Sequence, residues 1–173
     1  MHSFKTFINF LTDKDSCVPN YESLYYGMLR QTGWGNKTSE LFTKTIYHLH
    51  NGKYGFQNSI WEDAPKVINQ KEKIFLPVDA VIETTFHRIE PSTKWNFHKI
   101  NKFLQDNYSS EQMEIWDDLW FWGFINQRGS GLNREFIWNE AKYWALIETA
   151  KDETSINTIR ETSLGFLKLF DNK

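Results

Sequence analysis

The sequence contains one cysteine, Cys17, among its 173 residues. A single cysteine excludes a disulfide within the chain and any cysteine cluster that could hold zinc or an iron–sulfur centre. No apolar run reaches the ~20 residues that a membrane-spanning helix needs. The N-terminal segment also lacks a basic region followed by a long apolar core, so we expect no signal peptide. These absences predict an intracellular protein, in the cytoplasm or nucleoid or in a nucleus, with no membrane partner.

The chain also lacks an excess of charge of either sign. It has 20 basic and 22 acidic residues, which give a net charge of −2. A nucleic acid would therefore have to be bound by a local basic patch rather than by the whole surface. Aromatic residues, by contrast, are abundant and make up 17% of the chain. With this length, such a composition favours one packed globular domain over a disordered chain.

Helical periodicity dominates the chain, and the alternation that would indicate a sheet is absent. We therefore predict an all-α fold, a single compact helical domain over residues 1–173 that contains a helix–hairpin–helix motif. Its expected parts are a hairpin region at about 20–50, an insertion at about 51–75, a helix at about 79–89 and C-terminal helices at about 110–170. The individual helices are expected over residues 4–11, 20–30, 36–50, 79–89, 92–105, 113–125, 134–150 and 155–170.

Local signals support several of these helices. Ser3 is expected to cap the first helix, and the sequence SSEQ at 109–112 is a capping signal. Leu41, Phe42, Ile46 and Leu49 fall on one side of the third helix and are expected to be its buried face. The run MEIWDDLWFWGFI is apolar on almost all sides and predicts one central buried helix. The segment IWEDAPKVI is compatible with a short helix, and the glycine-rich NQRGSGLN with a turn.

The stretch QTGWGNKTSELF, residues 31–42, lies between the second and third helices. Gly33 and Gly35 permit a tight turn and leave backbone N–H groups bare at a helix N-terminus, where a phosphate can be held. Lys37 would then lie in the first turn of the following helix. Taken by itself, this pattern also fits an ordinary helical hairpin with a solvated lysine.

A second motif, LPVDAVI at 76–82, places Asp79 at the start of a later helix. Together, GWGNKT and PVD resemble the helix–hairpin–helix DNA glycosylases, the superfamily of endonuclease III and 8-oxoguanine glycosylase. The resemblance covers roughly residues 18–125. It implies that Lys37 is the Schiff-base nucleophile and Asp79 its electrostatic partner, and that Gly33, Trp34, Gly35 and Asn36 contact DNA.

The implied chemistry suits these residue types. A carboxylate stabilises the positive charge that develops on the sugar as the N-glycosidic bond breaks. A neutral amine can attack C1′ and form a Schiff base, and β-elimination then nicks the strand. The implied partner is double-stranded DNA with a damaged or modified base, flipped out of the stack, and no cofactor is implied. Gln127 and Arg128 are further candidates for phosphate contact, although a surface turn is the simpler explanation for them.

The layout of the chain departs from the superfamily pattern at two points. Residues 51–75 separate the two motifs as an apparent insertion, whose Lys53, Lys66, Lys71 and Lys73 could form a basic patch. Only about thirty residues precede the hairpin, where superfamily members have several helices. The helices from Arg134 onward could fill their place, or a partner chain could complete the N-terminal lobe.

Two other interpretations stay open. The chain could be a non-catalytic helical module that keeps the hairpin for binding DNA or protein, or the two motifs could coincide by chance. In either case Asp79 would be a simple helix N-cap. His48 and His50 do not face each other on a helix, so we expect no metal site there. Trp116, Trp120 and Trp122 are expected in the core.

Overall fold

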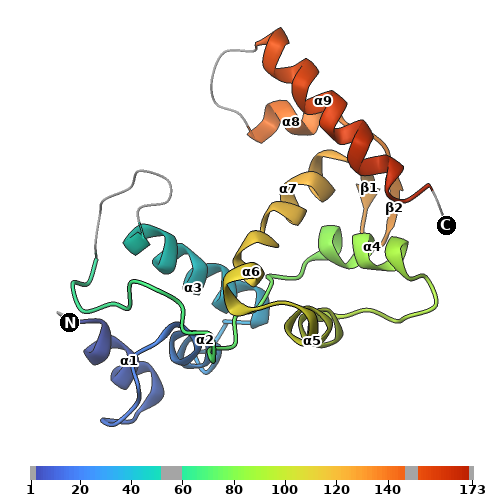
Figure 1. Ribbon diagram of the computed structural model, residues 1–173. Helices are drawn as coiled ribbons and strands as arrows, with labels where there is room; N and C mark the ends of the chain where they lie inside the picture. Colours follow the sequence, from blue (N-terminus) through green and yellow to red (C-terminus); the bar gives the residue numbers. More distant parts are fainter. Residues whose placement is uncertain (1–2, 52–59, 147–151, 172–173) are drawn as a thin grey trace. The chain divides into compact units, whose positions relative to one another are not determined.

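The computed structural model describes residues 3–51, 60–146 and 152–171 (Figure 1). These residues are mostly helical, which confirms the predicted fold class at this level. The exception is one antiparallel hairpin of two strands, β1 (Gln127–Ser130) and β2 (Asn133–Phe136). Contacts divide the chain into two compact units, Met1–Pro77 with Asn101–Ile115 as unit 1, and Val78–Ile100 with Trp116–Lys173 as unit 2. Whether the chain folds as one cooperative domain stays a prediction.

Unit 1 begins with three helices, α1 (Phe4–Thr12), α2 (Tyr21–Leu29) and α3 (Asn36–Asn51). The Ser3 side chain caps α1, as predicted, by accepting from Thr6 N. Asn20 caps α2 in a capping box with Ser23. Helix α2 packs against both α1 and α3. The helix boundaries therefore agree closely with the periodicity and the capping residues.

The predicted apolar side of helix α3 is confirmed in part, because Ile46 is buried and Phe42 and Leu49 are half-buried, but the helix also buries polar side chains. Leu41 is 54% exposed, whereas Glu40 is fully buried and Lys44 is 4% exposed. The Glu40 carboxylate accepts from Phe75 N at 3.3 Å, and Lys44 Nζ donates to the carbonyl of Met113 at 3.4 Å. Buried polar side chains are tolerated only where hydrogen bonds compensate for lost water. Here they bond backbone groups of neighbouring segments.

Residues 60–76 contain neither helix nor strand, so the short helix expected at 60–68 is absent. The backbone of this segment is bonded by side chains instead of by a ladder. Asn101 holds both backbone groups of Leu76, accepting from N at 2.5 Å and donating to O at 3.1 Å. Further side chains bond it in the same way: Tyr21 to Pro65, Glu22 to Lys73, Gln105 to Ile74 and Ser110 to Glu72. The described part of the apparent insertion is thus an integral part of unit 1.

Unit 2 contains α4 (Ala80–Ile89), α7 (Asp118–Ile125), the β-hairpin, α8 (Glu140–Leu146) and α9 (Glu153–Lys168). Helix α4 packs on α7 at Gly123, where a Cβ would come within 2.7 Å of Val81. Ile125, Tyr143 and Ile156 form a small core, with half-buried aromatic residues packed around it. The lack of a side chain at Gly123 therefore allows the close approach of the two helices.

Several predicted elements are wrong in detail. The expected central helix at 113–125 is two helices, α6 (Ser110–Ile115) and α7, separated at residues 116–117, and its aromatic residues are only half-buried. Helix α5 (Phe97–Asn107) begins later than Ser92. The expected helix from Arg134 is replaced at its start by β2, because Gly131, with φ of 60°, turns the chain back after Ser130. The end of that predicted helix lies at residues 147–151, outside the described residues.

In the described part of the chain, no helix combines the length and the apolar character needed to cross a membrane.

The capping signal at 109–112 is confirmed, because Ser109 N donates to Gln112 Oε1 at 2.9 Å and Gln112 N to Ser109 Oγ at 3.3 Å. Lys53 of the expected basic patch lies outside the described residues.

Candidate functional site

The connection between α2 and α3 is a tight turn over residues 30–35. Trp34 N donates to Gln31 O at 3.1 Å, and Gly33 has a φ of 86°, which favours glycine. No atom lies within 4 Å of where a Cβ would be at Gly33 or at Gly35. The Trp34 ring packs edge-on against Phe42, 5.5 Å between centroids. The side chains of Arg30 and Gln31 also bond backbone carbonyls of α1 and α2, so the turn is held on both sides while both glycines face open space.

Helix α3 begins directly after this turn. Ser39 N donates to Gly35 O at 2.9 Å, so Gly35 is the N-cap residue and Lys37 lies in the first turn. The Lys37 side chain is exposed, whereas the Asn36 amide oxygen accepts from the Tyr25 hydroxyl at 3.0 Å. The first N–H groups of a helix have no acceptor within it and carry the positive end of its dipole. This end of α3 can therefore bind an anion beside a primary amine.

Asp79 is the N-cap of α4, as expected. Its Oδ1 accepts from Val81 N at 2.9 Å and from Ile82 N at 3.2 Å. Its Oδ2 accepts a 2.9 Å hydrogen bond from the indole Nε1 of Trp120. Both carboxylate oxygens are thus held in place, and the carboxylate has a defined orientation at the start of α4.

Trp120 is the functional candidate that the sequence did not reveal. Its burial is intermediate, and its ring stacks on Phe124 at 4.9 Å with an interplanar angle of 12°. Lys142 Nζ lies 4.6 Å from the Phe124 centroid and donates to the carbonyl of Gln127. Burial and the neighbouring charge of Arg134 lower the pKa of Lys142. Position 120 fits a helical apolar pattern, so periodicity gave no sign that its N–H bonds Asp79.

Gln127 and Arg128 have different environments. The Gln127 side chain is fully buried and donates to Val81 O at 3.0 Å and Thr85 Oγ1 at 2.9 Å. The Gln127 side chain thus joins the β-hairpin to α4, and none of its surface is left for a phosphate. Arg128 is exposed on β1, opposite Glu135, and is the one of the pair placed where DNA could reach it.

Two further features contain side chains of the types found in reactive centres. Lys44 is buried, but the cavity beside it measures about 10 Å³, which is far too small for a sugar. His48 Nδ1 lies 3.4 Å from Glu114 Oε1, while His50 stacks on Trp61 instead. Over the described ranges of the chain, no group of three or more His, Cys, Asp or Glu side chains could hold a metal ion.

Lys37 belongs to unit 1 and Asp79 to unit 2, and each residue lies at the start of a helix. No protein-family model matches the chain, and neither the curated proteins nor the solved structures include a match. The assignment to the helix–hairpin–helix DNA glycosylases therefore stays a prediction based on the two motifs.

Proposed function

We propose that this chain is a DNA base-excision glycosylase with AP-lyase activity, in which residues 20–50 act as a DNA-binding helix–hairpin–helix. The observation that carries the proposal is the start of α3, where the Gly33–Gly35 turn meets the exposed Lys37. Bare backbone N–H groups there would hold a DNA phosphate. The lysine amine would stand beside the same strand.

In the proposed reaction, the Lys37 amine attacks C1′ of a flipped nucleotide through its nitrogen lone pair. The C1′–N bond breaks, and the damaged base leaves with the bonding electrons and takes up a proton. The Asp79 carboxylate stabilises the positive charge on the sugar while that bond breaks. Opening of the sugar ring gives a Schiff base between Lys37 and C1′, and proton loss from C2′ expels the 3′ phosphate.

A non-catalytic DNA-binding module is the second candidate function. It is favoured by one specific observation: both Asp79 oxygens already accept hydrogen bonds, from the N-terminus of α4 and from Trp120. Under this alternative, Asp79 serves only to begin a helix. The hairpin would still bind phosphate, but no covalent step would follow.

Strand nicking separates these two functions. A duplex with one abasic site would be incubated with the wild-type protein, and the products separated on a denaturing gel. The glycosylase–lyase predicts a nick at the abasic site with a sugar fragment left on the 3′ end. A module that only binds predicts a shifted band in a native gel and an intact strand in the denaturing gel. If the wild type gives neither, both proposals are wrong.

A further inference from the structure

Unit 1 contains a hollow of about 490 Å³ between residues 70–74, helix α5 and the start of α6. We call it the lysine hollow because three lysines line it, Lys71, Lys73 and Lys102. The acidic residues of its lining are Glu72 and Asp106. All three lysines are exposed. The first two belong to the apparent insertion, and the third lies on α5.

The alternation of side chains along residues 71–74 explains why both lysines of this segment lie on its exposed side. Exposure alternates along these residues, with Lys71 and Lys73 exposed and Glu72 and Ile74 buried. The intervening carboxylate faces inward, where it accepts from Tyr21 N at 2.9 Å and Asn69 N at 2.8 Å. The acidic residue between the lysines is therefore used inside the fold, and the rim keeps an excess of positive charge.

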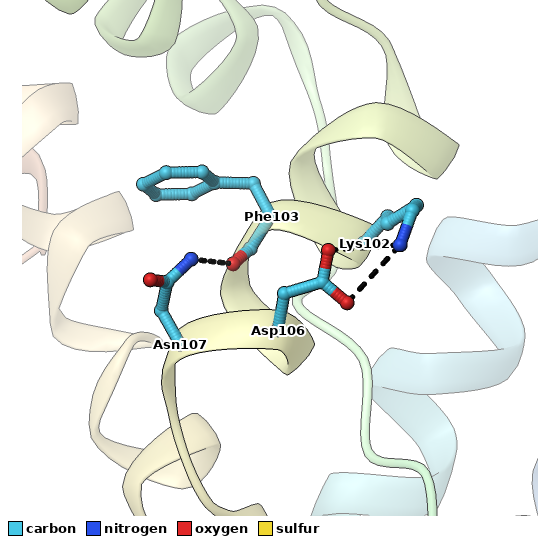
Figure 2. A network of polar contacts seen from close by, with 4 residues as sticks. All are labelled: Lys102, Phe103, Asp106 and Asn107. Carbon is cyan, nitrogen blue, oxygen red and sulfur yellow. Dashed lines mark hydrogen bonds and ion pairs between the residues drawn. The ribbon is translucent and has the colours of Figure 1, made fainter.

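The third lysine has an acidic neighbour. Lys102 Nζ contacts the two carboxylate oxygens of Asp106 at 2.8 and 3.1 Å, one turn further along α5 (Figure 2). The two side chains are 76% and 56% exposed. An exposed pair of this spacing contributes little to stability, so an incoming phosphate can replace it.

We propose that the lysine hollow binds the phosphodiester backbone of DNA, as a second contact in addition to the one proposed at the start of α3. This inference rests on the proposed function. Ammonium groups on flexible stems are suited to phosphate as point charges. An acidic peptide would also need apolar anchor pockets. Of the apolar residues that line this hollow, Ile74 and Met113 are almost completely buried, and only Tyr108 is exposed.

The test measures affinity for an abasic duplex over a range of salt concentrations. Lys71→Ala/Lys73→Ala should weaken binding and reduce the slope of log K against log[salt] by about 1.8, because each phosphate contact contributes about 0.9. The matched control is Lys5→Ala/Lys66→Ala, which removes two exposed lysines of unit 1 that do not line the hollow. The inference is wrong if the two double variants have the same slope.

A gain-of-binding variant provides the opposite test. Asp106→Asn removes a negative charge from the rim and releases Lys102, so it should tighten binding and steepen the salt dependence. Unchanged or weaker binding would overturn the inference. The wild type could nick abasic DNA while both hollow variants bind DNA as the wild type does. That result would refute only the second contact. A wild type that binds no duplex DNA would refute the proposed function and this inference together, and equal competition by polyglutamate would assign the hollow to an acidic peptide instead.

Discussion

The indole N–H of Trp120 and the carboxylate of Asp79 form a 2.9 Å hydrogen bond that joins α7 to the first residue before α4. With the two backbone N–H donors on its other oxygen, this bond fixes the plane of the carboxylate. A carboxylate that stabilises a developing positive charge acts best when its position is fixed before the reaction. Trp120 is therefore a positioning residue in the proposed reaction.

Trp120→Phe should slow base release roughly tenfold, since a loss of ~1.4 kcal/mol of transition-state stabilisation has that effect. The stacking on Phe124 would be kept, but one oxygen of Asp79 would lose its donor. Trp144→Phe is the matched control, because Trp144 Nε1 also donates to a carboxylate, Glu140, at 3.0 Å. The rate of base release in single-turnover assays checks both variants. Equal rates for Trp120→Phe and the wild type would remove the positioning role.

Asp79→Asn should stop base release and should also destabilise unit 2. Each oxygen of the Asp79 carboxylate accepts from N–H donors. The asparagine side chain has only one oxygen, so its NH₂ group must face the donors on one side. A buried donor without an acceptor costs about 1–3 kcal/mol. In a Trp120→Phe background the same substitution should cost less, because the second donor is gone. Urea unfolding of the four proteins measures this coupling, and additive costs would contradict it.

The two glycines of the α2–α3 turn should differ in their effect on stability. Gly33→Ala forces an L side chain into a positive φ and should cost roughly 1–2 kcal/mol. Gly35→Ala has open space and no positive φ, so it should cost less than about 1 kcal/mol through the weaker N-cap. Midpoints of chemical unfolding compare the two variants. A larger loss at Gly35 than at Gly33 would show that the turn has a different conformation.

His50 should make the stability of unit 1 depend on pH. Burial lowers its pKa, and the nearby Asp63 offsets only part of that effect. The neutral form is thus favoured in the folded state, while the unfolded chain titrates near the usual value of about 6.5. Stability is complete above that value and falls as the pH drops through it towards the lower folded pKa. His50→Gln should flatten this part of the stability profile between pH 7 and 5, and an unchanged profile would exclude His50 as the cause.

Local signals in the sequence predicted much of the helical framework. Ser3, Asn20 and Asp79 begin helices in the way their side chains favour, and Gly33 and Gly35 mark a real turn. These features depend on neighbouring residues alone. The β-hairpin was missed because its strands are only four residues long, although Gly131 carries the turn signal.

Features that depend on distant segments were not predictable in the same way. Glu40 and Lys44 are buried because they bond the backbone of residues 75 and 113, and nothing beside them in the sequence indicates those partners. The bond from Trp120 to Asp79 likewise joins residues that no local pattern relates. Buried polar side chains of this kind follow from the tertiary arrangement rather than from periodicity.

The most direct test of the proposed function is covalent trapping with borohydride on DNA that contains an abasic site. Reduction of a Schiff base would fix the protein to the DNA, and the adduct would be seen as a slower band in a denaturing gel. Lys37→Gln should abolish the adduct while leaving most of the affinity for DNA, since backbone N–H groups provide the phosphate contact. Lys5→Gln is the matched control, because Lys5 is also exposed at the second position of a helix. We expect an adduct for the wild type and Lys5→Gln and none for Lys37→Gln. An adduct that persists in Lys37→Gln, or a wild type that forms none, would contradict it.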